Sequence, residues 1–115
     1  MNYNIQKEET ILLKNENQVK QIYIENISFI KCEGYLSILY LIDHSQIRCS
    51  KLLKDFESEL QVYYFYRINH NTIINLRYFD NIIYGERKRT IALKGGHKFR
   101  VSRRKWSIIK KKLGL

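Results

Sequence analysis

Residues 91–105 have the sequence IALKGGHKFRVSRRK, in which two β-like segments surround a pair of glycines. Alternating apolar and polar side chains on both sides of Gly95-Gly96 are typical of strands joined by a tight turn. The primed turns of such hairpins need positive φ, which glycine adopts without steric cost. Directly after the second strand, Ser102 can cap a helix. The stretch therefore predicts a hairpin that leads into a helix over residues 103–113.

A second helix is predicted over residues 51–60, with Ser50 as its cap. Apolar residues at helical spacing would form its buried face, namely Leu52, Leu53, Phe56 and Leu60. The C-terminal helix has a similar stripe, and Gly114 follows where that helix should end. The stripe consists of Trp106, Ile109 and Leu113. We interpret both stripes as core-facing surfaces and not as ligand contacts.

Most of the remaining chain is predicted to be β-strand. Runs of β-forming residues, separated by polar turns, cover residues 10–13, 19–24, 27–31, 35–42 and 46–49. In the run over residues 35–42, one face would consist of Leu36, Ile38, Tyr40 and Ile42. The pattern predicts a mainly β fold, largely antiparallel, with about two short helices. We expect one domain over residues 1–115.

Composition excludes several classes of protein. With 115 residues, 44% of them hydrophobic, the chain can bury a core and should not be disordered. No apolar run approaches the ~20 residues of a membrane span, and residues 1–7 lack the apolar segment of a secretion signal. We therefore expect a cytoplasmic protein. Cys32 and Cys49 lack zinc-ligand spacing and are interpreted as buried apolar residues, with a disulfide left open.

Positive charge is concentrated in the second half of the chain. Residues 1–63 carry 7 basic and 9 acidic side chains, whereas residues 64–115 carry 14 basic and 2 acidic ones. From Arg87 to Lys112 there are 12 basic residues and no acidic one. Because crowded like charges repel, this asymmetry indicates a polyanionic partner. Nucleic acid, an anionic membrane surface and an acidic protein are all compatible with the charge alone.

The sequence gives little support to catalysis. It has no glycine-rich phosphate loop, no nucleophile motif and no pair of carboxylates suited to acid–base chemistry. Asp80 and Glu86 are the only carboxylates after residue 63, and a metal-dependent nuclease would need more. The three histidines are scattered and suggest no metal site. We predict that the protein is not an enzyme and uses no cofactor.

Two polar segments are candidates for contact with a polyanion. Asn69-His70-Asn71 lies between strand-forming residues, where it either forms a simple turn or presents its side chains to bases and phosphates. The second segment is Ser102 followed by Arg103, Arg104 and Lys105. Cations at a helix N-terminus oppose the helix dipole, so an external anion would offset them. Lys110-Lys111-Lys112, at the other end, is favourable without a ligand.

The order of these segments resembles the LytTR-type DNA-binding domain, the output module of many bacterial response regulators. The matching segments are residues 27–35, 52–60 and 65–75, Gly95-Gly96, and residues 101–104. The resemblance covers nearly the whole chain, from about Thr10 to Leu113. It implies an elongated β-rich domain whose loops enter successive major grooves of duplex DNA.

The resemblance also implies which residues contact DNA. One loop corresponds to residues 34–37, from which Tyr35 and Ser37 are expected to contribute. The family's Arg-x-His-Arg/Lys-Ser pattern falls on Arg67 and on Asn69-His70-Asn71, where three replacements should change the base preference. The family's second contact point is retained as Ser102-Arg103. A bidentate contact between Arg103 and guanine would contribute ~1–3 kcal/mol of discrimination.

Family members usually carry a receiver domain or membrane segments ahead of this module. Here the resemblance begins close to Met1. We therefore expect no receiver domain, and either an isolated domain or a free-standing regulator controlled by a separate partner protein. The family often binds promoter direct repeats, so the chain would be a monomer in solution or a dimer on DNA.

The leading hypothesis is a sequence-specific transcription regulator that binds duplex DNA. The alternative is a non-specific or RNA-binding module, in which Tyr63-Tyr64-Phe65-Tyr66 would stack on unpaired bases, although strand alternation should bury half of these rings. A third possibility is a surface for an acidic protein or an anionic membrane. Stronger binding to single strands than to duplex would favour the RNA-binding or non-specific module. Binding to anionic vesicles without binding to nucleic acid would favour the surface for a membrane or an acidic protein.

Overall fold

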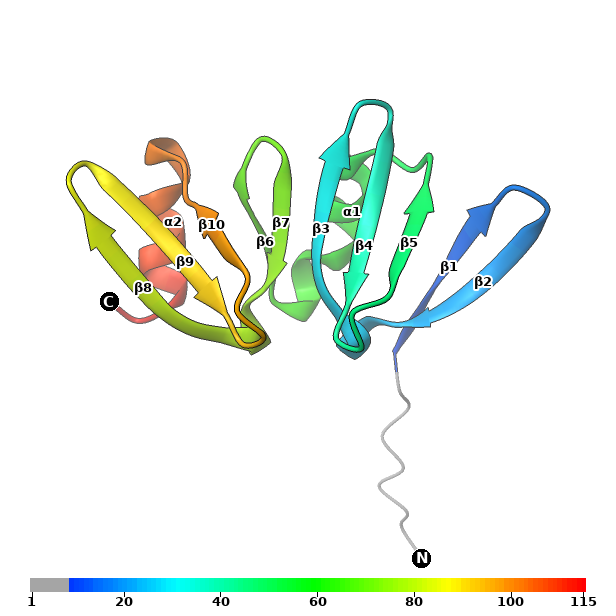
Figure 1. The fold of residues 1–115 in the computed structure, drawn as a ribbon, viewed down its shortest axis with the longest axis horizontal. Helices are drawn as coiled ribbons and strands as arrows, with labels where there is room; N and C mark the ends of the chain where they lie inside the picture. The colour runs from blue at the N-terminus through cyan, green and yellow to red at the C-terminus, as the bar shows by residue number, and fades with distance from the viewer. Residues whose placement is uncertain (1–8) are drawn as a thin grey trace, which may run out of the picture.

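The computed structural model describes residues 9–115, within which three antiparallel sheets lie side by side (Figure 1). The first sheet pairs β1 (Thr10–Asn15) with β2 (Gln18–Tyr23). The central sheet has the order β5-β4-β3-β7-β6, formed by β3 (Ile27–Glu33), β4 (Leu36–Leu41), β5 (Gln46–Cys49), β6 (Phe65–Asn69) and β7 (Thr72–Asn75). The third has the order β10-β9-β8, formed by β8 (Phe79–Gly85), β9 (Lys88–Leu93) and β10 (Lys98–Arg100). The predicted mainly β fold is confirmed.

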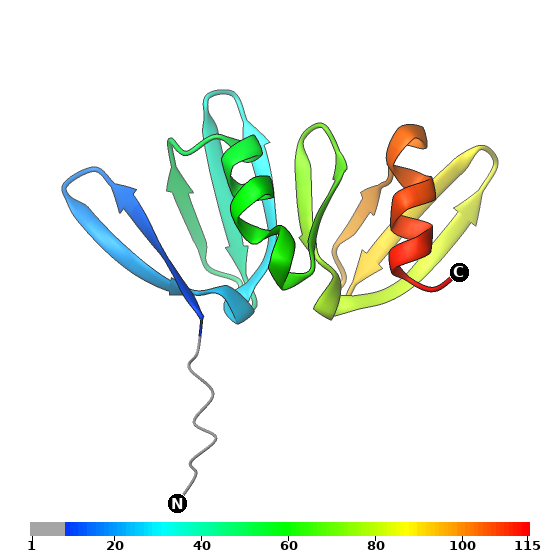
Figure 2. The same cartoon turned by 180° about the vertical axis from the view of Figure 1, so that it is seen from behind.

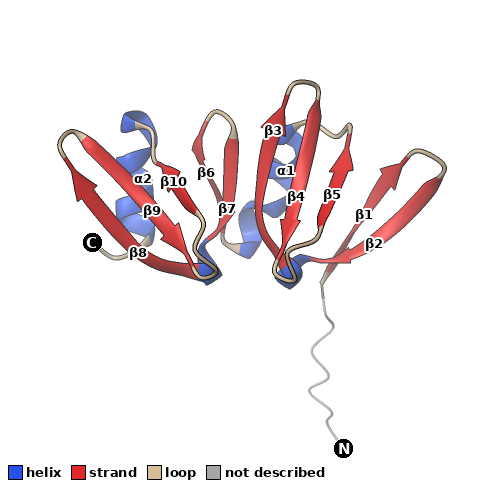
Figure 3. Cartoon of the chain, viewed as in Figure 1, coloured by secondary structure: helices blue, strands red, loops and turns tan. Residues whose placement is uncertain are grey.

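Two α-helices cover the same face of this row of sheets, as the reverse view in Figure 2 shows. Helix α1 (Leu53–Leu60) lies against the central sheet, and α2 (Arg103–Lys112) lies against the third sheet and β6. Short 3-10 turns η1 (Ile24–Asn26) and η3 (Leu76–Tyr78) connect the sheets, and η2 (Gln61–Tyr63) follows α1 (Figure 3). In the described range, neither helix has the length and apolar character needed to span a bilayer.

The buried side chains form two clusters, one under each helix. Phe56 and Leu60 of α1 are fully buried in the first cluster, together with residues from β1 to β5. Ile109 of α2 lies in the second cluster with residues of β6, β7 and β9. Trp106 and Leu113 are partly buried against this second cluster, so the predicted stripe of the C-terminal helix faces the core.

Phe29 connects the central sheet to the third sheet. It lies in β3, yet its buried ring belongs to the cluster under α2. The ring stacks on Tyr40 at a centroid distance of 4.3 Å and contacts the rings of Phe99 at 4.6 Å and His97 at 4.7 Å. Strand β3 is therefore packed on both faces, which explains why residues 27–30 are all buried and do not alternate.

The start of α1 differs from the prediction. Leu52, in extended geometry, is the N-cap residue and no side chain caps the helix, so Ser50 is not the cap. The Ser37 hydroxyl donates a hydrogen bond to the Lys51 carbonyl at 2.6 Å, which ties this part of the chain to β4. Leu52 consequently lies outside the helix with 54% of its surface exposed, and it does not join Leu53 in the buried face.

Strands β4 and β8 also depart from simple alternation. Ser37, Ile38 and Leu39 are all buried because β4 is packed on both sides, whereas Leu36 and Ile42 are exposed. Leu36, Ile38 and Tyr40 alternate along β4 and share one face as predicted, whereas Ile42 lies beyond the strand and the second buried face was not predicted. Strand β8 was not predicted, because its burial pattern lacks period two; its pairing with β9 shifts register once, between Phe79 and Asn81.

The predicted hairpin over Gly95-Gly96 is confirmed, but its turn is of another type. Both glycines have positive φ, of 103° and 93°. The Gly96 N–H donates to the Leu93 carbonyl at 3.1 Å, so Lys94 and Gly95 are the central turn residues. Lys94 is not among the residues with positive φ, and a primed turn requires positive φ at that position.

Ser102 caps α2 as predicted: its hydroxyl oxygen accepts a hydrogen bond from the Lys105 N–H at 3.3 Å. Replacing Ser102 with alanine should lower the free energy of unfolding by ~1 kcal/mol, the usual effect of losing a cap. Urea denaturation followed by circular dichroism would measure it. Ser50→Ala is the matched control, since Ser50 is exposed and caps nothing, and an equal loss in that variant would contradict the assignment.

Candidate nucleic-acid interface

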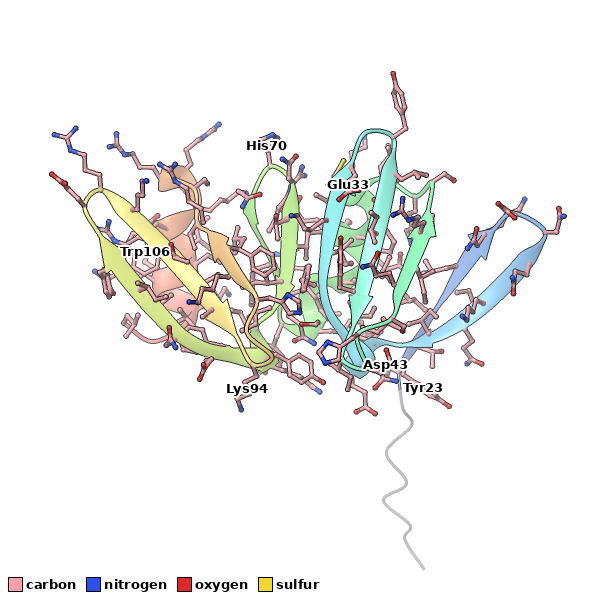
Figure 4. All side chains as sticks on the ribbon, viewed as in Figure 1. Tyr23, Glu33, Asp43, His70, Lys94 and Trp106 are labelled. Carbon is pink, nitrogen blue, oxygen red and sulfur yellow. The ribbon has the colours of Figure 1, made fainter. Side chains whose placement is uncertain are left out.

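One long edge of the molecule is built from loop tips. The tips of the hairpins β1–β2, β3–β4, β6–β7 and β8–β9 all project toward this edge, at the top of Figure 1, and the N-terminus of α2 lies there too. His70 occupies this edge in Figure 4, whereas Lys94 and Asp43 lie at the opposite one. Separate projecting tips can contact a long, regular partner at several places along its length.

A groove of about 560 Å³ lies on this edge between the β6–β7 tip and the start of α2. It joins segments that are far apart in sequence, since residues 69–71 line it together with Ser102 and Arg103. The remaining lining residues are Lys31, Thr72, Lys98, Phe99 and Arg100. Within residues 9–115, no carboxylate lines the groove, so its surface favours an anion.

The Asn69 side chain connects two segments that line this groove, because both the oxygen and the nitrogen of its amide form hydrogen bonds. Its Nδ2 donates to the Arg100 carbonyl at 2.8 Å, and its Oδ1 accepts from the Asn71 N–H at 2.9 Å. The Ser102 N–H donates to the Ile68 carbonyl at 2.8 Å, which fixes the start of α2 against β6. Asn69 therefore acts as a positioning residue, and its polar atoms are already engaged.

Arg67 also positions the β6–β7 tip. Its Nη2 donates to the His70 carbonyl at 2.5 Å, and its Nη1 lies 3.4 Å from a Glu57 carboxylate oxygen. These partners hold the guanidinium against the protein and fix the backbone of the turn. The side chains of His70 and Asn71 are left exposed beside the groove.

A second groove, of about 480 Å³, continues the basic surface toward the β8–β9 tip. It is lined by Arg87, Arg89, Arg100 and Arg103, together with Val101 and Trp106. Arg100 and Arg103 line both grooves, so the two are connected. Because no carboxylate of the described part of the chain lines this groove either, and guanidinium groups pair bidentately with phosphate, it is suited to a polyanion.

Aromatic rings hold one of these arginines in place. The Arg89 guanidinium lies 5.4 Å from the centre of the Tyr84 ring and 5.6 Å from that of Trp106. Its Nε is buried without a hydrogen-bond partner among the described residues. Stacking on two rings limits the conformations of the side chain, so part of the cost of ordering an arginine is removed before any anion binds.

The other predicted residues lie outside the two grooves. Tyr35 is 97% exposed at the β3–β4 tip, on the same edge but on a separate hairpin. Ser37 is only 2% exposed and its hydroxyl is bound to the Lys51 carbonyl, so we remove it from the candidate interface. Arg104 and Lys105 follow Arg103 along α2 and line neither groove.

Several groove residues were missed from the sequence. Arg87, Arg89, Lys98 and Arg100 belong to the basic run that carries no acidic residue, and this run was the available signal. Lys31 lies in the acidic half of the chain, and nothing in the sequence around it indicated that it would line the groove. It reaches the groove because β3 pairs with β7, where Lys31 is opposite Thr72.

Neither a metal cluster nor a disulfide is found among residues 9–115, and Cys32 is only partly buried beside the β3–β4 tip, where its thiol donates to the Gly34 carbonyl at 3.5 Å. No group of three or more His, Cys, Asp or Glu side chains is placed to hold a metal ion between residues 9 and 115. Cys32 and Cys49 are both free thiols, and burial raises the pKa of the Cys49 thiol. The neutral thiol is thereby favoured, in keeping with its interpretation as a buried apolar side chain.

Comparison with known proteins identifies the family. The LytTr DNA-binding domain family matches residues 17–114. The fold is similar to the solved structure of a LytTr DNA-binding domain from Bacillus cereus, in a protein named as a methyl-accepting/DNA response regulator, with a TM-score of 0.80 and 16% identity over 95% of this chain and 100% of that one. No curated protein matches. The chain therefore belongs to the LytTR family of DNA-binding domains.

Proposed function

We propose that this domain recognises a specific sequence of duplex DNA through the edge of loop tips and thereby regulates transcription. The observation that supports this most strongly is the pair of connected grooves, which bring His70 and Asn71 beside Arg103 and which no carboxylate of residues 9–115 lines. In this proposal the domain regulates transcription by binding DNA and catalyses no reaction. Lysine and arginine side chains supply affinity through phosphates, and a few side chains contact base edges.

Arg103 is the best placed candidate for base recognition. It lies in the first turn of α2, lines both grooves and is exposed. Arginine bonds bidentately to the O6 and N7 atoms of guanine in the major groove. His70 and Asn71 would contact neighbouring bases from the β6–β7 tip. Tyr35 projects from another tip on the same edge, which is consistent with loops entering successive major grooves.

The aromatic segment proposed for single-strand binding does not form a platform. Phe65 is buried, Tyr63 and Tyr66 pack against the two cores, and only Tyr64 is exposed. Tyr64 precedes β6, whereas His70 follows the other end of that strand. The exposed ring is therefore at the end of β6 away from the basic grooves, and this arrangement favours duplex over unpaired DNA or RNA.

Fluorescence anisotropy would test the proposal. The protein is titrated with a random duplex, a single strand of the same sequence and fragments from upstream of its own gene, each at several salt concentrations. We expect one fragment to bind about a thousandfold more tightly than random duplex. Equal, salt-sensitive binding to every probe, or preference for the single strand, would refute sequence-specific regulation.

The same fragment allows the proposed arrangement on DNA to be tested. If the site contains direct repeats, native mass spectrometry should find two copies of the chain on the full fragment and one on a half-site. One copy on both would exclude binding as a pair. We also propose that a separate regulatory protein controls this domain by changing its affinity for the fragment.

Arg87 is expected to contact phosphate, because it lies at the far end of the second groove, on the β8–β9 tip. Arg87→Gln should weaken binding to specific and random duplexes by the same factor and reduce the salt slope by about 1. The control is Lys94→Gln, which removes one charge at the opposite edge and should change neither quantity. A loss confined to the specific duplex would instead assign Arg87 to base contact.

A further inference from the structure

A pocket of about 440 Å³ lies at the C-terminal end of α2 and the start of β6, away from the two basic grooves described above. Its walls are mainly apolar and come from four elements, with Tyr66 on β6, Leu76 on η3, Phe79 on β8 and Leu113 at the end of α2. These four residues are only partly buried by the protein itself. The volume is in the range of sites that hold small organic ligands.

Two cations flank this apolar pocket without a counter-ion. The Arg77 guanidinium lies 5.9 Å from the centre of the Tyr64 ring, and the Lys112 ammonium lies 5.4 Å from that of Tyr66. Within residues 9–115, no carboxylate lines the pocket and neither cation takes part in a salt bridge. A lysine is favourable at the C-terminus of a helix, which accounts for Lys112. That argument does not apply to Arg77, which lies in η3.

We infer that this pocket binds a small organic carboxylate with an aromatic or branched apolar body. The body would be buried against Tyr66, Phe79 and Leu113, while the carboxylate would lie between Arg77 and Lys112. An organic cation would be repelled, and a neutral molecule would leave both charges without a partner. A simple phosphate would have no body to bury, and the four-arginine groove suits it better. Binding of the carboxylate in this pocket does not depend on DNA binding at the opposite edge.

The test compares 3-phenylpropanoate with its uncharged amide, 3-phenylpropanamide, by NMR titration of the 15N-labelled chain. The acid should shift the backbone amides of residues around Tyr66, Leu76, Phe79 and Leu113. We expect it to bind about tenfold more tightly than the amide, since two charge-assisted contacts are lost in the latter. Equal affinities, or no shifts at millimolar concentrations of the acid, would overturn the inference.

Variants that remove one positive charge beside the pocket test where the carboxylate of the ligand lies. Arg77→Gln and Lys112→Gln should each weaken binding of the acid by about threefold, the scale of an exposed ion pair, and should leave the amide unchanged. Lys110→Gln is the matched control, because Lys110 is exposed on α2 and does not line the pocket. An equal loss in that control would indicate general charge attraction. Shifts confined to His70 and Arg103 would place the acid in the DNA-facing groove instead, and either result would refute the site.

Discussion

Arg103→Ala should lower affinity for the specific duplex by about 10- to 100-fold while reducing affinity for random duplex much less. A bidentate contact with guanine contributes ~1–3 kcal/mol of discrimination, whereas one phosphate contact contributes equally to every sequence. Arg103 is placed for such a contact because the Ser102 cap and the bond between the Ser102 N–H and the Ile68 carbonyl fix the first turn of α2. Anisotropy titrations with both duplexes would give the two affinities.

Arg103→Lys separates geometry from charge. Lysine keeps the positive charge but lacks the planar fork that matches two acceptors. This variant should bind random duplex almost as the original chain does and should lose much of the preference for the specific site. Equal losses on the two duplexes in Arg103→Ala would show that Arg103 contacts a phosphate, and the assignment of base recognition would then fail.

The sequence predicted both ends of α2 from local signals, whereas the same kind of signal at Ser50 gave a wrong start for α1. Ser102 and Gly114 bound α2 as expected, because a cap and a left-handed glycine act within a few residues. The central strands were harder, since burial on both faces of β3 and β4 depends on Phe29 and Tyr40 packing against a sheet formed much later in the chain. Period-two alternation identifies a half-exposed strand and cannot reveal the second covered face.

The candidate site shows the same limit at the level of single side chains. Residue type and charge pointed to the segments that contain His70 and Arg103, and the fold brings these segments into one groove. They could not show that Ser37 would be bound to a backbone carbonyl, or that Asn69 would hold two strands together. A polar side chain near a binding surface is either presented or already bonded, and only the three-dimensional partners distinguish the two.

Phe29→Ala should strongly destabilise the fold, lowering the free energy of unfolding by ~3–5 kcal/mol. The ring is 2% exposed, stacks on Tyr40 of the same sheet and contacts Phe99 and His97, which follow β9 in the chain. That loss is a large share of the ~5–15 kcal/mol that stabilises a typical domain. Urea denaturation of Phe29→Ala would measure it, with Leu12→Ala, which truncates a 65% exposed side chain, as the control.

The same position tests whether the grooves depend on the packing between the sheets. Phe29 is two residues from Lys31, and Phe99 is next to Arg100, so we expect the contact between the two rings to influence the spacing of these two groove cations. Phe29→Leu keeps most of the volume and should remain folded, yet it should weaken specific DNA binding because the tilted ring contacts of Phe29 with Phe99 and His97 no longer hold the two sheets together. If Phe29→Leu bound DNA as tightly as the original chain, the hydrogen bonds of Asn69 and Ser102 alone would be sufficient to position the groove.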